Sequence, residues 1–186
     1  QATLACAIPG AGQHRDYNKE NIMKYVFCPQ CGKLLENREI GDEGLIKFCG
    51  NCNIPIFEHF GQCTLSVVIN EYNEIALLKQ DYVSKTNWIL IAGYIKKGET
   101  LEESAIREVY EETGQKVVKI EYINSYFYNK KEIMMAGFKC NVIKKAFNNS
   151  KEVDKIKWFK IIEVENLLRD GSIGQKLFQS VKERIF

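Results

Sequence analysis

The chain has 186 residues, of which 45% are hydrophobic and 27% charged, as in ordinary soluble globular proteins. This length allows one domain of about 100–150 residues with a small accessory unit, and it excludes two large domains. The net charge of +2 is too balanced for a dedicated nucleic-acid-binding protein. No apolar run reaches the roughly 18 residues that a membrane span needs.

A coherent pattern begins only near residue 23, so we expect residues 1–22 to be an N-terminal arm or a vector-derived segment. The opening lacks the basic stretch and continuous apolar run of a secretory signal. Cys6, Cys63 and Cys140 lie outside any motif and are odd in number, which favours a reducing compartment. We therefore predict a cytoplasmic protein with no membrane partner, in which Cys63 and Cys140 are small core residues.

Four further cysteines occur as two Cys-x-x-Cys pairs. Cys28 and Cys31 form the first pair, and Cys49 and Cys52 form the second after seventeen intervening residues. This spacing is typical of a zinc site, because each tight turn directs two thiolates at one point. Disulfides or unrelated thiols are the alternative. We expect a structural Zn²⁺ in a ribbon over residues 23–61, since four thiolates fill the tetrahedral shell.

The remaining chain alternates short apolar runs with helical patterns. Predicted strands cover residues 64–69, 74–79, 88–92, 117–128, 132–142 and 155–160, and the first two form a hairpin. A helix is predicted over residues 101–112, with Thr100 and Glu103 as its capping box and Gly114 as its terminator. Two tail helices are predicted over 163–169 and 174–186. A mixed sheet flanked by helices is the expected α/β or α+β outcome.

In the helix predicted over residues 101–112, acidic side chains lie on the apolar side. An acidic face that only contacts solvent would lie on the opposite side. At about 100° per residue, Glu112 lies within the apolar stripe and Glu108 at its margin. With Glu111 they are spaced i, i+3 and i+4, so they repel one another and lose hydration, and a bound cation offsets both effects. Oxygen ligands suit a hard ion, so we predict Mg²⁺ or Mn²⁺ binding.

This segment resembles the box that defines the Nudix family. The matching residues are Gly93, Glu99, Arg107, Glu108, Val109, Glu111, Glu112 and Gly114. The family pattern ends in an apolar residue where this chain has Gln115, a difference that we expect to affect local packing only. The resemblance implies the Nudix α/β/α sandwich with a mixed sheet over residues 62–186, preceded by the small four-cysteine zinc ribbon.

The resemblance also implies roles for single residues in hydrolysing a nucleoside diphosphate linked to another moiety. The implied Mg²⁺ or Mn²⁺ ligands are Glu108, Glu111, Glu112, the carbonyl of Ala92 and, beyond the box, Glu152. The implied orienting pair is Arg107 and Glu99. The box glycines are Gly93, Gly98 and Gly114, of which Gly93 and Gly98 are implied to shape the loop. The general base is open among the carboxylates, including Glu111, Glu112 and Glu152.

A four-cysteine ribbon before this domain is similar to the NADH pyrophosphatase branch, whose members hydrolyse NAD(H) to nicotinamide mononucleotide and AMP and are known as dimers. That branch carries a proline-rich specificity signature after the box. The aligned residues here, which we take as substrate-binding candidates, are Ser125, Tyr126, Phe127 and Tyr128. Their rings could stack on a base, but the rigid prolines are lost, so ADP-ribose and other dinucleotides stay open as substrates beside NAD(H).

A second class of function also stays open, in which the ribbon binds a partner and the chain senses nucleotides or binds nucleic acid. The complete set of box carboxylates favours the enzyme, because a sensing domain has no need to keep them together. We therefore expect a pyrophosphohydrolase with a small nucleotide as its partner and homodimerisation as in the related branch. A nucleic-acid partner is not expected, although NAD-capped RNA stays open as a substrate.

Overall fold

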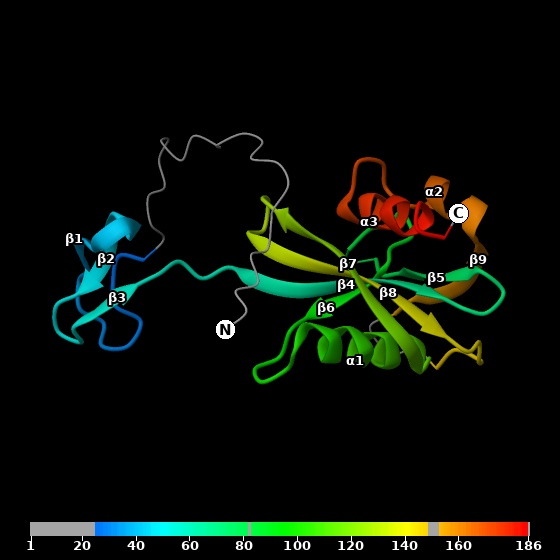
Figure 1. The fold of residues 1–186 in the computed structure, drawn as a ribbon, viewed down its shortest axis with the longest axis horizontal. Helices are drawn as coiled ribbons and strands as arrows, with labels where there is room; N and C mark the ends of the chain where they lie inside the picture. The colour runs from blue at the N-terminus through cyan, green and yellow to red at the C-terminus, as the bar shows by residue number, and fades with distance from the viewer. Residues whose placement is uncertain (1–24, 82, 149–152, 186) are drawn as a thin grey trace, which may run out of the picture. The chain divides into compact units, whose positions relative to one another are not determined.

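The computed structural model describes residues 25–81, 83–148 and 153–185. The expectations for residues 1–22, Cys6 and Glu152 lie outside these residues. The chain divides into two compact units, Gln1–His59 and Phe60–Phe186, which are described separately (Figure 1). Among the described residues, no helix is both long and apolar enough to cross a membrane.

The first unit contains a small antiparallel sheet in the order β1-β2-β3. Its elements are β1 (Glu36–Glu39), the 3-10 helix η1 (Gly41–Glu43), β2 (Leu45–Cys49) and β3 (Ile54–Ile56). The buried hydrophobic cluster of this unit is small and consists of Cys28, Leu35, Cys49 and Ile56. Two of these four residues are motif cysteines, so little apolar surface is available to hold the ribbon together without a further crosslink.

The second unit contains a six-stranded mixed sheet. Its strands are β4 (Gly61–Ile69), β5 (Glu74–Lys79), β6 (Ile91–Tyr94), β7 (Val117–Tyr128), β8 (Ile133–Val142) and β9 (Lys155–Lys160). The order is β7-β8-β4-β5-β9, with β6 also paired to β4. Strand β4 runs parallel to β8 along one edge, while its other edge pairs with β6 at residues 63–66 and reaches β5 at the Ile69–Ile75 pair. This arrangement puts the start of the Nudix-like segment in the centre of the sheet.

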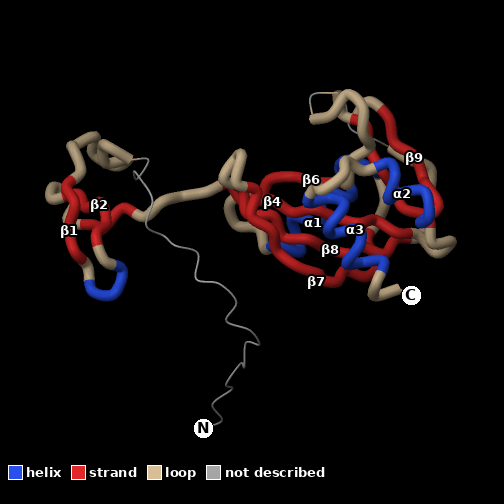
Figure 2. The backbone as a smooth tube through the Cα atoms, turned by 90° about the horizontal axis from the view of Figure 1, so that it is seen from above, coloured by secondary structure: helices blue, strands red, loops and turns tan. Residues whose placement is uncertain are grey.

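Helices cover both faces of this sheet, as Figures 1 and 2 show from two directions. They are α1 (Leu101–Thr113), α2 (Ile161–Leu167) and α3 (Ile173–Lys182). Alternate residues of β4 point to opposite faces: Val67 joins the cluster with Leu177 and Phe178 of α3, whereas Val68 joins the cluster with Val109 of α1. The expected α/β/α sandwich with a mixed sheet is therefore confirmed.

Several predicted elements have different ends in the structure, and the strand predicted over residues 64–69 begins at Gly61. The strand predicted over residues 88–92 is found at Ile91–Tyr94, because the Trp88 amide donates to the carbonyl of Leu167 and Ile89 makes only an isolated bridge. The first tail helix begins earlier, at Ile161, where the Glu163 carboxylate accepts from the Lys160 amide directly after β9. That start lacks a Ser, Thr, Asp or Asn cap, so the usual sequence signal is absent.

The second tail helix, predicted to reach residue 186, ends at Lys182. Beyond it, the side chain of Arg184 donates to the carbonyl of Ile123 at 3.1 Å and pairs with Glu121 at 3.0 Å. The backbone tightens at the same point, because the amides of Arg184 and Ile185 donate to the carbonyls of Val181 and Lys182, three residues earlier instead of four. The α-helical hydrogen-bond pattern therefore ends before the predicted residue.

Candidate functional site

The four motif cysteines lie together in the ribbon. Their Sγ atoms are all within 4.8 Å of one another, and they form the one group of three or more converging metal-ligand side chains in the described ranges. Tetrahedral Zn–S bonds of about 2.3 Å imply sulfur–sulfur separations of about 3.8 Å. Cys49 is fully buried, and its Sγ lies 3.5 Å from that of Cys31 and accepts from the Cys52 amide at 3.4 Å. The donor set and its spacing fit Zn²⁺.

Backbone turns and electrostatics prepare this cysteine cluster for a cation. The Gly32 amide donates to the Cys28 carbonyl, and Gly32 has a left-handed φ of 69°, as the tight turn between these residues requires. The backbone of Lys33 lowers the pKa of Cys31 to about 6. The pKa of Cys52 rises to about 12, first because its thiol is hydrogen-bonded to Cys31 and then through burial. Without a cation, Cys52 therefore keeps its proton while Cys31 loses its own more readily. A divalent cation would stabilise the thiolate form of all four cysteines.

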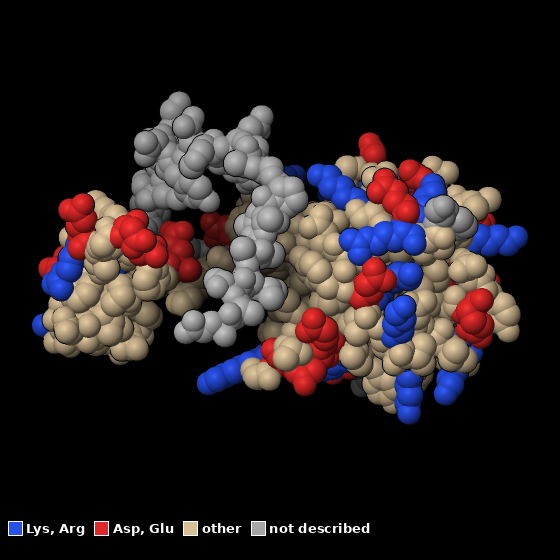
Figure 3. All heavy atoms as spheres, in the orientation of Figure 1, with Lys and Arg blue, Asp and Glu red and all other residues tan. Residues whose placement is uncertain are grey.

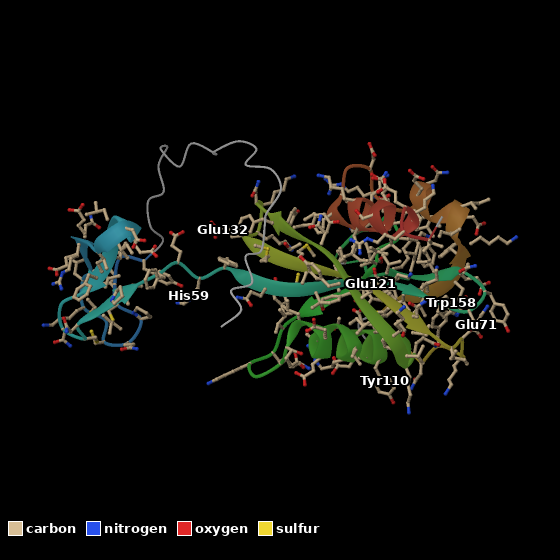
Figure 4. All side chains as sticks on the ribbon, in the orientation of Figure 1. His59, Glu71, Tyr110, Glu121, Glu132 and Trp158 are labelled. Atoms are coloured by element: carbon tan, nitrogen blue, oxygen red, sulfur yellow. The ribbon has the colours of Figure 1, made fainter. Side chains whose placement is uncertain are left out.

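Helix α1 is delimited as its sequence predicted. The Thr100 hydroxyl accepts from the Glu103 amide, the Glu103 carboxylate accepts from the Thr100 amide, and Gly114 ends the helix with a φ of 71°. Tyr110, on the outer side, is exposed and points away from the sheet (Figure 4). The opposite side carries Val109 into the core, and Glu112 beside it is only 6% exposed. The helix therefore presents acidic groups toward the sheet.

Glu108 lies against the backbone of β6. A Cβ atom built on Gly93 would overlap the carboxylate carbon and both carboxylate oxygens of Glu108. Gly93 pairs with Thr64 of β4 and is not in the left-handed region, so the absent side chain, not backbone freedom, is what this position requires. The absence of a side chain at Gly93 thus leaves the space that the Glu108 carboxylate occupies.

Arg107 contacts Glu99, its predicted orienting partner, and two further carboxylates. Its Nε and Nη2 bond both oxygens of Glu99 at 2.5 and 2.9 Å, and its Nη1 lies 2.5 Å from Glu108 and 3.0 Å from Glu111. Nη2 also donates to the carbonyl of Tyr94. This bidentate contact with Arg107 lowers the pKa of Glu99 to about 2, and the surrounding carboxylates raise that of Arg107. Arg107 and Glu99 nearly neutralise each other, so Glu108, Glu111 and Glu112 leave the site acidic.

The three helix carboxylates have different surroundings. Glu108 is inward-facing, with a side chain 13% exposed, whereas that of Glu111 is 46% exposed and lies 3.4 Å from the Lys96 ammonium. Glu112 is buried, and its Oε1 accepts a hydrogen bond from Gln80 at 3.0 Å. Within the described ranges these carboxylates do not form a group as compact as the four cysteines. They form a row along one side of α1, as the helical spacing dictates.

The other residues that the resemblance singled out are placed around this row. Ala92 is the β6 residue directly before Gly93. Gly98 has a φ of 93° in the turn before α1, a conformation that favours glycine. Glu152 is outside the described residues, but its neighbour Val153 is buried and the Asp154 amide donates to the Lys79 carbonyl, next to Gln80. Sequence reasoning missed Gln80, whose only local signal is a polar residue at the end of an apolar strand.

The four substrate-binding candidates on β7 do not form one surface. Ser125 and Phe127 lie on the α1 side, where Ser125 lines a pocket of about 440 Å³ and Phe127 makes an edge contact with Phe60. Tyr126 packs into the opposite cluster, beneath α3. Tyr128 pairs with Ile133 of β8 at the strand end. The two-residue period of a strand separates neighbouring side chains in this way.

Gln115, the departure from the family pattern, is fully buried and yet hydrogen-bonded. Its amide donates to the Lys145 carbonyl at 3.1 Å and accepts from the Lys145 amide at 3.0 Å. A buried side-chain amide thus satisfies backbone groups, as such positions require. Cys63 and Cys140 are also buried, and burial raises the pKa of their thiols to about 11 and about 12, so neither is an activated nucleophile.

Curated relatives match across most of the chain. The NAD-capped RNA hydrolase NudC of Vibrio parahaemolyticus is 30% identical over 156 residues, covering 82% of this chain and 58% of its own. The NAD-capped RNA hydrolase NudC of Vibrio atlanticus is 28% identical over 160 residues, covering 86% of this chain and 58% of its own. The chain therefore spans less than two thirds of the length of these relatives.

Solved structures and a family model agree with this similarity. A NUDIX hydrolase from Nitrosomonas europaea aligns with 87% of this chain and 93% of its own, with a TM-score of 0.65 and 23% identity. The NUDIX domain of Shewanella oneidensis NrtR, complexed with ADP ribose, aligns over 75% and 94% with a TM-score of 0.59 and 16% identity, which shows the fold alone. The model of the NUDIX domain matches residues 60–180, more than half of the chain. This protein therefore belongs to the Nudix family.

Proposed function

We propose that this protein is a divalent-metal-dependent pyrophosphohydrolase that cleaves the pyrophosphate bond of a NAD(H)-like dinucleotide. The observation that carries the proposal is the seating of Glu108 against Gly93, with Arg107 holding it and Glu112 buried one turn further along α1. A helix that only packed on the sheet would bury apolar side chains there. The similarity to NAD-capped RNA hydrolases of Vibrio supports the substrate class.

The proposed Mg²⁺ or Mn²⁺ site comprises Glu108, Glu111 and Glu112, the Ala92 carbonyl and Glu152. The donor set is all oxygen, which suits these ions, and the acidic charge left after Arg107 pairs with Glu99 fits a divalent cation. When bound, such ions neutralise pyrophosphate oxygens and lower the pKa of a water molecule. The four cysteines would hold a structural Zn²⁺, because their shell leaves no open position.

The chain's own residues would hold this arrangement in place. Arg107 fixes Glu99 and Glu108 through a planar guanidinium whose donors match carboxylates. We propose Glu111, the most exposed of the three carboxylates in the row, as the general base that takes a proton from a water molecule. Glu112 and Glu152 are the other candidates. We also propose that Ser125 and Phe127, on the pocket side of β7, contact the substrate, whereas Tyr126 belongs to the core beneath α3.

The setting and partners of the enzyme are proposals as well. We propose a cytoplasmic location, because a zinc-binding set of thiols needs reducing conditions, and a homodimer, which light scattering of the purified protein would test. The domain boundaries proposed from the sequence are 23–61 for the ribbon and 62–186 for the Nudix domain. On the face of the Nudix unit shown in Figure 3, basic and acidic side chains are interspersed, which favours a small nucleotide over a nucleic acid as the main partner.

The test is hydrolysis with Mg²⁺ or Mn²⁺ of a panel that contains NADH, NAD⁺, NAD-capped RNA, ADP-ribose, diadenosine polyphosphates, nucleotide sugars and nucleoside triphosphates. The expected products from NADH are the reduced nicotinamide mononucleotide and AMP, separated by chromatography. NAD-capped RNA would yield nicotinamide mononucleotide and a 5′-monophosphate RNA.

Each outcome of the panel has a distinct meaning. The highest kcat/KM on a NAD-type compound supports the proposal, and comparison of NADH with NAD-capped RNA identifies the preferred form. The highest kcat/KM on ADP-ribose or another nucleotide would keep the Nudix chemistry and overturn the dinucleotide specificity. If none of the compounds is hydrolysed, the proposal that the chain is an enzyme is overturned, and a nucleotide-sensing or nucleic-acid-binding role is favoured.

A further inference from the structure

Gln80, the residue that follows β5, contacts the carboxylate row without belonging to the Nudix-like segment. It is buried, and its Nε2 lies 3.0 Å from Oε1 of Glu112, a partner 32 residues away in the chain. An ionised carboxylate only accepts hydrogen bonds, so the side-chain amide must turn its NH₂ group toward Glu112. One oxygen of Glu112 is therefore held by a neutral donor.

The backbone on both sides of Gln80 is anchored. The Gln80 carbonyl accepts from the Val83 amide at 2.9 Å, the Lys79 carbonyl accepts from the Asp154 amide at 3.0 Å, and the Asp81 amide donates to the Asp154 carboxylate at 2.8 Å. These bonds tie the end of β5 to the start of β9. A side chain that projects from such a frame is fixed in position, as the support of a catalytic group needs to be.

The two inward carboxylates of α1 are held by different kinds of partner. Glu108 contacts the Arg107 guanidinium, a cation that offsets part of its charge. Gln80 is uncharged, so its contact orients the Glu112 carboxylate without bringing a positive charge to it. We propose that Gln80 is a positioning residue for Glu112, which sets how Glu112 meets a divalent metal and thereby limits turnover. The role of Glu112 in this inference rests on the proposed function.

The experiment replaces Gln80 by Met, which keeps the length of the side chain and removes the donor. Gln115→Met is the matched control, because Gln115 is also a buried glutamine, and its amide bonds backbone groups of residues 145 and 146 instead of a carboxylate. Three quantities are measured on the zinc-loaded full chain: kcat and KM for NADH with Mg²⁺, the Kd of Mn²⁺ by electron paramagnetic resonance, and Tm.

We expect Gln80→Met to lower kcat about tenfold, which corresponds to about 1.4 kcal/mol, with KM nearly unchanged and Mn²⁺ bound more weakly. Gln115→Met should lower Tm and leave kcat and the Mn²⁺ Kd within about twofold of the wild type.

Two results would overturn the positioning role while leaving the proposed function intact. One is a Gln80→Met variant with wild-type kcat and Mn²⁺ affinity. The other is an equal loss in both Met variants that follows their Tm values, which would make Gln80 a structural residue only. If the wild type hydrolyses nothing in the panel, the proposed function fails, and the Mn²⁺ affinities still decide the inference: a weaker Kd in Gln80→Met alone supports it, and equal values overturn it.

Discussion

Replacing Gly93 by Ala tests the geometry of the carboxylate site with a single methyl group. The added Cβ would occupy the space of the Glu108 carboxylate, whose carbon and both oxygens lie inside contact distance of that position. Because the φ of Gly93 is outside the left-handed region, alanine fits the backbone, and the perturbation acts on Glu108. Relief of the overlap requires the carboxylate to move by more than about 1 Å, and a displacement of that size typically lowers turnover about 10²-fold, or about 2.7 kcal/mol in the activation barrier.

The assay is kcat and KM for NADH with saturating Mg²⁺, accompanied by a thermal melt. Gly174→Ala is the matched control, since a Cβ there would make only ordinary van der Waals contacts, with Leu90 and Ser172, and alanine in the first turn of a helix is neutral or slightly stabilising. Gly93→Ala should remain folded, because Glu108 is partly exposed and can turn outward. A kcat for Gly93→Ala within threefold of the wild type would refute the argument that Gly93 is there to seat Glu108.

Variants of Glu112, Cys49 and Glu99 test the carboxylate row, the ribbon and the orienting ion pair. Glu112→Gln should lower kcat by at least about 10²-fold and keep the fold, whereas Glu102→Gln, on the exposed side of α1, should match the wild type; near-normal turnover by the first variant would contradict the role of Glu112. Cys49→Ser should reduce the zinc content measured by elemental analysis well below one ion per chain and lower Tm, because a fully buried ligand is lost; unchanged zinc would refute the ribbon site. The pKa of Glu99 is about 2 in the folded chain, against an ordinary value of 4.5, owing first to Arg107, so its stabilisation is present above about pH 4.5 and is lost as the pH falls toward 2. Glu99→Gln should thus show a flatter decline of Tm between about pH 5 and 2 than the wild type, and an equal slope would count against this ion pair.

Features that depend on near neighbours in the chain were readable from the sequence. The cysteine spacing predicted a cluster that the structure contains, and Thr100, Glu103 and Gly114 marked both ends of α1. The helical wheel placed Glu112 on the buried side, where it is found. These signals are local because turn geometry and helical periodicity depend on residues a few positions apart. The strand alternation likewise predicted a mixed sheet with helices around it.

The ends of the two tail helices and the contacts of Gln115 were not predicted from local sequence signals. The first tail helix starts directly after β9 without a preferred cap residue. The second ends at Lys182, shortly before Arg184, whose side chain donates to the Ile123 carbonyl of β7. Gln115 stands where the family pattern has an apolar residue, and the backbone near residue 145 satisfies its amide. The partners of Gln115 and Arg184 are distant in sequence, so no local pattern predicts these contacts.

By itself, the sequence determined the family resemblance, the four-cysteine ribbon and the acidic side of α1, because each of these is written in short, regular spacings. Only the tertiary structure decided that Glu108 rests on Gly93, that Gln80 meets Glu112, and that Ser125 and Tyr126 face opposite sides of the sheet. The physical reason is that β4, β5 and β6 bring together segments that the chain separates by tens of residues. Which side chains meet there depends on strand register and helix packing, and these are properties of the whole fold.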